Sequence, residues 1–507
     1  MYGDWEKPDP AELRIMGKQE DWDALVAKYA EGRDALPRPL RRCLEVARAG
    51  GASTVVIETR YLDPDYRSEH RAFHSQSFAS VPDTTHRLHF FKAVLTQDQL
   101  WQLPDYHGYL GYVVIRPYEF GPVGRTMLAP PPGLAPSIRT LVTDHVNFFG
   151  QDLAVTGVPF MQQDTQLSRC AHAAAWMCHY AGYLRGDTAR QATSEFAVSA
   201  DSSLGTSRVV PSEGMTDRQL LDLFRRFGLP AVFYRVDNLG PFPRLEWQPP
   251  DPTPPPKEDI AHQHPGHWDW RLIPIICRYL NSGYPVLVGA GEHAFVICGY
   301  TRTRREGDRD WITFIRHDDQ GGPYLQVDRP LEDVDPETGH VYSPWEMIFA
   351  PLPAKLWLTP EPVETTGGRL LRGLSNYAAD RVPEAAEIET LIGKQRLALR
   401  TYACRANDYK AGLIRRRLPT ELVREYRLAR LSRFVWVVEA IDRDRRQSNP
   451  DACVLGEAIF DATSNERSPR PMALHVPGFA ALFPVGSKAY SFRCVPDGYQ
   501  SGASGTP

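Results

Sequence analysis

Three residues far apart in the chain carry the side chains that nucleophilic acyl transfer needs. Cys170 offers a thiol, His293 an imidazole and Asp318 a carboxylate, in that order along the sequence. A catalytic thiol needs a base to remove its proton, and that base needs a third group to orient it. The sequence therefore predicts a cysteine–histidine–aspartate site, provided that the fold brings the three side chains together.

The segment around Cys170 is predicted to place the thiol at the start of a helix. Residues 168–184 read SRCAHAAAWMCHYAGYL, which is apolar on most sides and typical of a helix buried all round. With Ser168 as the expected N-cap, Cys170 lies in the first turn, where unpaired N–H groups and the helix dipole favour a thiolate. The alternative is a small buried residue in a packed helix, which Cys178 and Cys298 fit well.

His293 and Asp318 are predicted to lie at the same end of a β-hairpin. His293 opens the strand-like EHAFVICGY, Asp318 ends the strand-like ITFIRHD, and the polar TRTRREGDR between them is a turn signal. A turn centred on Arg305–Gly307 brings the two side chains within hydrogen-bonding reach. Asp319 remains an alternative, because a one-residue slip moves side chains to the opposite face. Taken alone, His293 is also typical of a histidine in a core, and Asp318 of an aspartate in a turn.

Glutamines shortly before the cysteine are candidates for a further role. A tetrahedral oxyanion needs hydrogen-bond donors, and Gln162, Gln163 and Gln166 all precede Cys170 closely. The alternative is that they form only a polar approach to the helix.

The motifs around these residues resemble papain-like cysteine peptidases, and most closely the bacterial branch that includes bacteriocin-leader-processing peptidases. The entry to that catalytic domain is similar to VPFMQQDTQLSRCAHAAAWM. Its second and third blocks resemble LNSGYPVLVGAGEHAFVICGY and RHDDQGGPY. The resemblance covers about residues 158–325, roughly a third of the chain.

This resemblance implies a role for each candidate residue. Cys170 would be the nucleophile and His293 the general base and acid, while Asp318 would orient His293. Gln163 would help to form the oxyanion hole. The family usually has glycine after the cysteine, whereas Ala171 follows here. Its glutamine usually lies six residues before the cysteine, whereas Gln163 lies seven before Cys170, so Gln166 stays open for that role.

The expected function is a cysteine peptidase or amidase that acts on a peptide or protein substrate through an acyl-enzyme, with no cofactor and no metal. With an amine instead of water as acceptor, the same residues would make an acyl transferase. The rival from a different class is a non-catalytic interaction protein that keeps a papain-like scaffold. The large flanking regions make a protein partner plausible, and Ala171 weakens the catalytic interpretation.

Composition and charge exclude several other classes. The 507 residues suggest about three domains and suffice for a core without disulfide or metal staples. With 58 basic and 62 acidic residues, the net charge of −4 argues against a nucleic-acid or membrane-surface partner. No signal peptide or membrane-spanning stretch is evident. The eight cysteines show no CxxC pair, which favours a reducing, cytoplasmic setting.

The fold class expected from the sequence is α+β in three regions. Residues 1–150 are predicted to be mainly β after a helical stretch at 10–50. Residues 151–358 are predicted to form the papain-like domain, with a core helix packed on an antiparallel sheet. Residues 359–507 are predicted to form a further α+β region. The proline-rich 241–256 is expected to be an extended loop, and His262, His264 and His267 beside it are expected to be solvated rather than zinc ligands.

Overall fold

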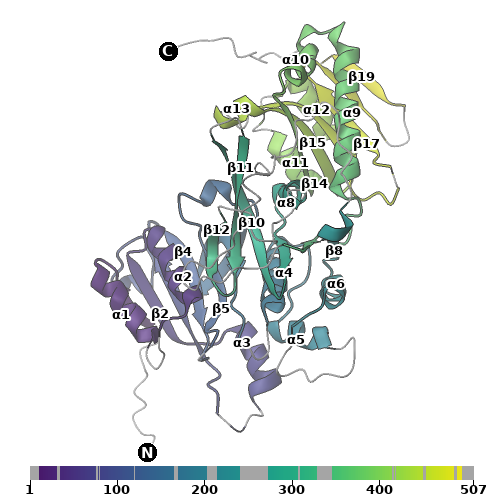
Figure 1. Ribbon diagram of the computed structural model, residues 1–507. Coiled ribbons are helices and arrows are strands. Elements are labelled where there is room, and N and C mark those ends of the chain that lie inside the picture. The colour runs from purple at the N-terminus through teal and green to yellow at the C-terminus, as the bar shows by residue number, and fades with distance from the viewer. Residues whose placement is uncertain are drawn as a thin grey trace, which may run out of the picture. The chain divides into compact units, whose positions relative to one another are not determined.

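A computed structural model gives the arrangement of the chain (Figure 1). It describes residues 11–30, 35–75, 78, 80–118, 120–164, 169–201, 214–239, 272–305, 309–327, 345–413, 416, 418–448, 453–466, 468–484 and 488–493. Within these ranges, helices combine with three antiparallel sheets, so the predicted α+β class is confirmed. The chain forms two compact units. The first comprises Met1–Asn238, Pro254–Asp269 and Gly283–Pro353, and the second comprises Leu239–Thr253, Trp270–Ser282 and Ala354–Pro507.

The first sheet of unit 1 has, over the described residues, seven strands in the order β1-β2-β3-β4-β5-β7-β6. The segments STVVIETRYL, RLHFFKAVL and YLGYVVIRPY, rich in β-branched and aromatic residues, predict strands, which β2, β3 and β4 confirm. The helix expected from residue 10 is wrong at its start. There the chain pairs with β2 as an edge strand, because the ladder of backbone hydrogen bonds and the burial of Ala11 outweigh helical propensity. The strands and helices are β1 (Ala11–Ile15), α1 (Gln19–Ala30), α2 (Arg38–Ala49), β2 (Thr54–Tyr61), α3 (Pro64–Glu69), β3 (Thr85–Phe91), β4 (Tyr109–Ile115), β5 (Val123–Leu128), β6 (Val142–Phe148) and β7 (Gln151–Phe160).

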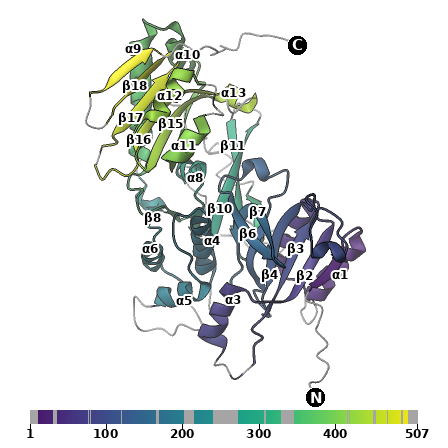
Figure 2. The same cartoon turned by 180° about the vertical axis from the view of Figure 1, so that it is seen from behind.

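Residues 140–160 predict two strands around a turn at Phe149–Asp152, and the structure has the two strands as β6 and β7, with a shorter turn because Gln151 and Asp152 already pair in β7. Phe149 and Gly150 both have positive φ angles, 48° and 87°, as a two-residue hairpin turn requires. The apolar side chains of this hairpin pack with those of β2, β3 and β4 in a core of their own, which includes Val146, Phe148 and Tyr112. The hairpin therefore covers one face of the sheet (Figure 2).

The second sheet of unit 1 contains the predicted strands on either side of His293. Its order over the described residues is β12-β11-β10-β9-β13-β8. Helix α4 packs against β10, β9 and β7, as expected for a core helix on an antiparallel sheet (Figure 1). The spacing of Thr216 and Gln219 in the sequence predicts a capping box, and the structure has it at the start of α6. The bounds are α4 (Cys170–Leu184), α5 (Thr193–Asp201), α6 (Asp217–Arg226), β8 (Ala231–Arg235), β9 (Val286–Ala290), β10 (His293–Arg305), β11 (Arg309–Asp318), β12 (Gly322–Val327) and β13 (Met347–Pro351).

Strand β7 connects the two sheets of unit 1. It pairs with β5 and β6, so residues 151–160 complete the first sheet, and the chain then continues to the cysteine helix. The fully buried Tyr324 of β12 reinforces this junction. Its hydroxyl donates to the Leu128 carbonyl at 2.8 Å and accepts from the Val158 N–H at 2.9 Å. The division of the chain at residues 150 and 358 stays a prediction.

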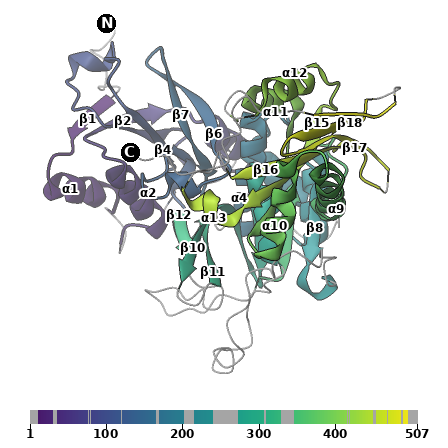
Figure 3. The ribbon, with the colours of Figure 1, turned by 90° about the horizontal axis from the view of Figure 1, so that it is seen from above.

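Unit 2 is a sheet with helices on both faces (Figure 3). Over the described residues its strands follow chain order, from β14 to β19. Helix α9 packs on one face, where Gly367 lies close to Val438, and α11 and α12 pack on the other. The sequence predicts a helix at ELVREYRLARL (421–431) and strands at FVWVVEAI (434–441) and CVLGEAIF (453–460), and α12, β15 and β16 confirm these elements. The bounds are α8 (Leu272–Asn281), α9 (Pro360–Ala379), α10 (Glu387–Gly393), β14 (Leu397–Arg405), α11 (Ala406–Gly412), α12 (Thr420–Leu428), β15 (Phe434–Asp442), α13 (Arg443–Ser448), β16 (Val454–Asp461), β17 (Pro471–Val476), β18 (Phe479–Leu482) and β19 (Tyr490–Arg493).

Some sequence predictions concern residues that the structure does not describe. The proline-rich segment 241–256 and the histidines at 262, 264 and 267 lie outside the described residues. Among the helices that the structure describes, none combines the length and the apolar character that crossing a bilayer needs.

The two hydrogen bonds of the Tyr324 hydroxyl connect the two sheets of unit 1, so their removal should lower the stability of the protein. Tyr324→Phe leaves the Val158 N–H and the Leu128 carbonyl buried without this partner, so the free energy of unfolding should fall by about 1–3 kcal/mol. Urea unfolding measures the loss. Tyr106→Phe removes a hydroxyl from an exposed side chain and is the matched control. Equal stability of the two variants would contradict the role given to Tyr324.

Candidate active site

Cys170 is the first residue of helix α4, so its predicted place in the first turn is confirmed. The N-cap is Arg169, one residue later than expected, and Ser168 lies outside the described residues. The Arg169 N–H donates to the His172 ring at 3.3 Å, which closes the first turn. As the first helical residue, Cys170 has a backbone N–H without an acceptor inside the helix. Its thiol is partly buried and donates to the Glu292 carbonyl at 3.6 Å.

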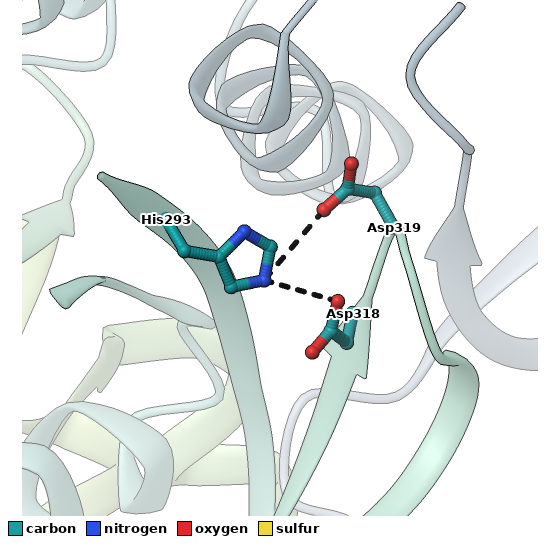
Figure 4. Close-up of side chains that lie close together, drawn as sticks. All are labelled: His293, Asp318 and Asp319. Atoms are coloured by element: carbon teal, nitrogen blue, oxygen red, sulfur yellow. Dashed lines mark hydrogen bonds and ion pairs between the residues drawn. The ribbon is translucent and has the colours of Figure 1, made fainter. Parts of the chain in front are cut away.

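His293 and Asp318 come together as the sequence predicts (Figure 4). The His293 Nε2 lies 3.1 Å from Asp318 Oδ1 and 3.9 Å from Asp319 Oδ1. Both carboxylates are fully buried, at 0% side-chain exposure. Asp318 is held further by the Gln320 N–H at 2.9 Å and by Arg316 Nη2 at 3.4 Å. Of the two carboxylates, Asp318 thus makes the shorter contact with the imidazole and is itself the better supported.

The hairpin register behind that prediction is wrong by two residues. Val296 pairs with His317, and continuing this register places His293 opposite Gln320 rather than opposite Asp318. Strands β10 and β11 extend further toward their turn than the sequence suggested. The bulge in β10 corrects only part of the resulting shift between the expected and the observed pairing. The contact still forms because Asp318 ends β11 at the same end of the hairpin at which His293 begins β10, with its Oδ1 3.1 Å from His293 Nε2.

The electrostatics of the pair favour a charged imidazole. Burial alone would lower the pKa of His293, but the Asp318 carboxylate and a hydrogen bond with Cys170 raise it to about 11. Burial alone would raise the pKa of Asp318, but His293 and Arg316 hold it well below its usual value. Each group is thus charged at neutral pH. The contribution of His293 to stability is present below about pH 6.5 and is lost as the pH rises through about 11.

Asp319 has the opposite electrostatics. Burial raises its pKa to about 7, although His293 pulls it down. Neither carboxylate oxygen has a geometrically satisfactory hydrogen-bond partner among the described residues. Burial and the neighbouring Asp318 charge outweigh the groups that favour its ionised form, so Asp319 resists ionisation more than an exposed aspartate does.

The exposed side chains of the site line an open pocket of about 590 Å³. Gln163, Cys170 and His293 all line it, whereas Asp318 lies buried behind the imidazole. Gln166 lies outside the described residues. The pocket also has apolar walls, formed by Ala171, Met215, Leu220, Leu287, Ala294, Met347 and Phe349. The structure thus brings together the cysteine, the histidine and Gln163, the second of the three candidate glutamines.

Sequence reasoning missed Gln320, a pocket residue next to the imidazole. Its side-chain nitrogen lies 3.4 Å from His293 Nδ1, on the side of the ring away from Asp318. Gln320 lies in the turn that follows β11, so strand alternation could not have indicated its place beside the imidazole.

The sequence also gave no sign of the arginine that holds the Gln163 segment. Arg116 follows β4 and is buried, with Glu69 as its counter-charge at 3.3 Å. Its Nη2 donates to the carbonyls of Gly121 at 2.6 Å and Gln162 at 2.8 Å. The chain just before Gln163 is therefore anchored to the first sheet.

His293, Asp318 and Asp319 also form a set of potential metal ligands. One ligand atom from each lies within 4.8 Å of the others. Structural zinc sites usually have four protein ligands, and this set offers three among the described residues. Arg316 already neutralises Asp318 at 3.4 Å, so a cation would compete with a guanidinium there.

Comparison with known proteins leaves the geometry as the basis for assigning a function. No protein-family model matches the chain, and no curated protein matches it.

The unequal carboxylates predict opposite effects of two matched substitutions. Because the folded-state pKa of Asp319 lies above its usual value, the free energy of unfolding falls as the pH rises from about 4 through about 7. Asp319→Asn removes this loss and should stabilise the protein at about pH 8. Asp318→Asn should destabilise it there, since His293 loses its partner. Urea unfolding at about pH 4 and pH 8 measures both. Destabilisation by Asp319→Asn at pH 8 would contradict the assignment.

Proposed function

We propose that the chain is a cysteine-dependent peptidase or amidase with a papain-like catalytic region. The observation that carries the proposal is the convergence of two groups on one open pocket. One is a thiol at the start of a helix, and the other is an imidazole paired with a buried carboxylate. The packing of that helix on the strands that carry His293 is what a papain-like core would require.

The proposed reaction begins with the Cys170 thiolate, which the His293 imidazolium stabilises. The sulfur attacks the substrate carbonyl carbon and forms a C–S bond. The C–N bond then breaks, and His293 gives its proton to the leaving amine. Water attacks the resulting thioester while His293 takes up its proton, and the sulfur leaves as the thiolate. Asp318 keeps the imidazole oriented through both steps.

The negative oxygen of the tetrahedral intermediate needs donors on the pocket side of the thiol. The Cys170 backbone N–H is available at the first helical position, and the Gln163 side chain lines the same pocket. The Arg116 contacts support this role, because they hold the segment that carries the glutamine. A preorganised donor stabilises the transition state without reorganisation.

The substrate class that fits best is a peptide or protein. The pocket is open on one side, so an extended chain can cross it, and its apolar walls can take an uncharged side chain. An amine acceptor in place of water would give acyl transfer by the same groups. A non-catalytic scaffold that binds a protein partner is the alternative from another class, and loss of thiol reactivity would favour it.

The proposal predicts selective alkylation of Cys170. At about pH 6, iodoacetamide should modify Cys170 at least about tenfold faster than the other described cysteines, because only Cys170 borders an imidazolium and an open pocket. The closest comparison is the half-buried Cys404, whose pKa burial raises to about 12. Mass spectrometry of the modified chain reports each site.

The control variants separate the imidazole from general access. His293→Ala should abolish the excess rate at Cys170, whereas His145→Ala, an exposed histidine on β6, should leave it unchanged. Equal alkylation rates at Cys170 and Cys404 would contradict the proposal and favour the non-catalytic scaffold instead. Profiling with a peptide library, with Cys170→Ala as the blank, then identifies the cleaved bond. Loss of cleavage with EDTA and its recovery with a divalent metal would favour metal chemistry at His293 instead.

A second prediction assigns the oxyanion donor once a cleaved peptide is known. Gln163→Ala should lower kcat by about 10²–10³-fold with little change in KM, because the donor acts mainly in the transition state. Gln166→Ala is the matched variant from the same segment and should have a small effect. The reverse pattern would give the role to Gln166.

A further inference from the structure

A second concave site lies in unit 1, away from the residues of the candidate active site. It is a pocket of about 450 Å³ between the first sheet and the β6–β7 hairpin that covers it. This volume is within the range of sites for small molecules. Unlike the first pocket, it is lined mainly by charged and aromatic side chains, which come from separate strands: Glu58, Tyr61, Arg87, Tyr112, Arg125, Asp144, His145, Asn147 and Phe149.

The two arginines of this pocket are tied to acidic partners. Arg87 stacks on the Tyr61 ring at 3.8 Å, and its Nε donates to Glu58 Oε2. Arg125 donates to Asp63 and to the Tyr61 hydroxyl, each at 2.9 Å. The cations are therefore held in place by the protein before any ligand arrives.

Each of the three central groups keeps an atom for a ligand. Arg87 is 6% exposed, and its Nη1 has no hydrogen-bond partner among the described residues. Glu58 accepts contacts through Oε2, which leaves Oε1 without a described partner. In Asp144 only Oδ2 accepts described hydrogen bonds. The pocket thus offers one positively charged donor and two negatively charged acceptors.

Asp144 is the strongest sign of a missing partner. It is 6% exposed, yet no cation lies within ion-pair distance of it in the part of the chain that the structure describes. The Tyr112 hydroxyl donates to its Oδ2 at 2.7 Å and the Tyr180 hydroxyl at 3.4 Å. A buried carboxylate is normally paired with a cation or a metal. A positively charged group of a ligand would supply what the protein does not.

We propose that this pocket binds a small zwitterion of the α-amino-acid class, with its ammonium group at Asp144 and Glu58 and its carboxylate at Arg87. A simple amine would meet the charges of Arg87 and Arg125, and a simple carboxylate would meet those of Glu58 and Asp144. A molecule that carries an ammonium and a carboxylate group on the same carbon offers a partner to the free atoms of both signs. The site does not depend on the function proposed for Cys170.

The proposal is tested by titration calorimetry on the full chain with L-alanine, L-leucine, L-glutamate and L-arginine. At least one of these should bind. N-acetyl-L-leucine lacks the ammonium group, and isopentylamine lacks the carboxylate. If L-leucine binds, each of these two compounds should bind at least about tenfold more weakly, because a charge-assisted hydrogen bond is lost. If another amino acid binds instead, its own N-acetyl derivative and its own decarboxylated amine are compared with it in the same way. This comparison uses the unaltered protein, so it does not depend on whether a variant folds.

Matched variants locate the binding site. Asp144→Asn keeps an acceptor for the tyrosine hydroxyls but removes the charge, and it should weaken amino-acid binding at least about tenfold. Asp152→Asn makes the same change at an exposed position of the same hairpin and should leave binding unchanged. The proposal is overturned if none of the four amino acids binds at about 10 mM. It is also overturned if the amine binds as tightly as the amino acid, or if a folded Asp144→Asn chain binds like the parent.

Discussion

The buried contact between His293 and Asp318 is the interaction on which the candidate active site depends. Two charges removed from water are favourable only when geometry and further hydrogen bonds compensate for the lost hydration. Here Arg316 and the Gln320 N–H share that task, and the ends of β10 and β11 hold the imidazole beside the carboxylate. An unpaired imidazolium at this depth would be strongly unfavourable. The alignment of these two strand ends is therefore a condition of stability as well as of the proposed chemistry.

The first sheet also helps to form the site, because it holds the segment that carries Gln163. Arg116 anchors the carbonyl that precedes Gln163, and Glu69 balances the charge of that arginine. Tyr324 connects the second sheet back to strands β5 and β7 through both of its hydroxyl contacts. Unit 1 thus uses buried polar contacts, rather than apolar packing alone, to place the thiol helix and the histidine strand around one pocket.

Local patterns in the sequence predicted much of this arrangement. The alanine-rich run gave the helix at Cys170, and Thr216 with Gln219 gave the start of α6. The side chains of His293 and Asp318 meet as expected, although the assumed register was wrong, because bulges and turn positions depend on tertiary contacts that the sequence does not display. The roles of Arg116 and Gln320 were missed for the same reason. Nothing in the local sequence pattern marks an arginine whose acceptors are distant carbonyls.

The path of β7 has a consequence for how such a protein can be controlled. Many hydrolases are switched on when a protease removes an N-terminal pro-segment. A cut between residues 150 and 151 would fall in the turn between β6 and β7, and β7 would stay in the sheet. Complete excision of the first 150 residues would take β5 and Arg116 away from the strand that leads to the thiol. Shedding that region would therefore remove both the partner strand and the arginine that hold the chain leading to Cys170.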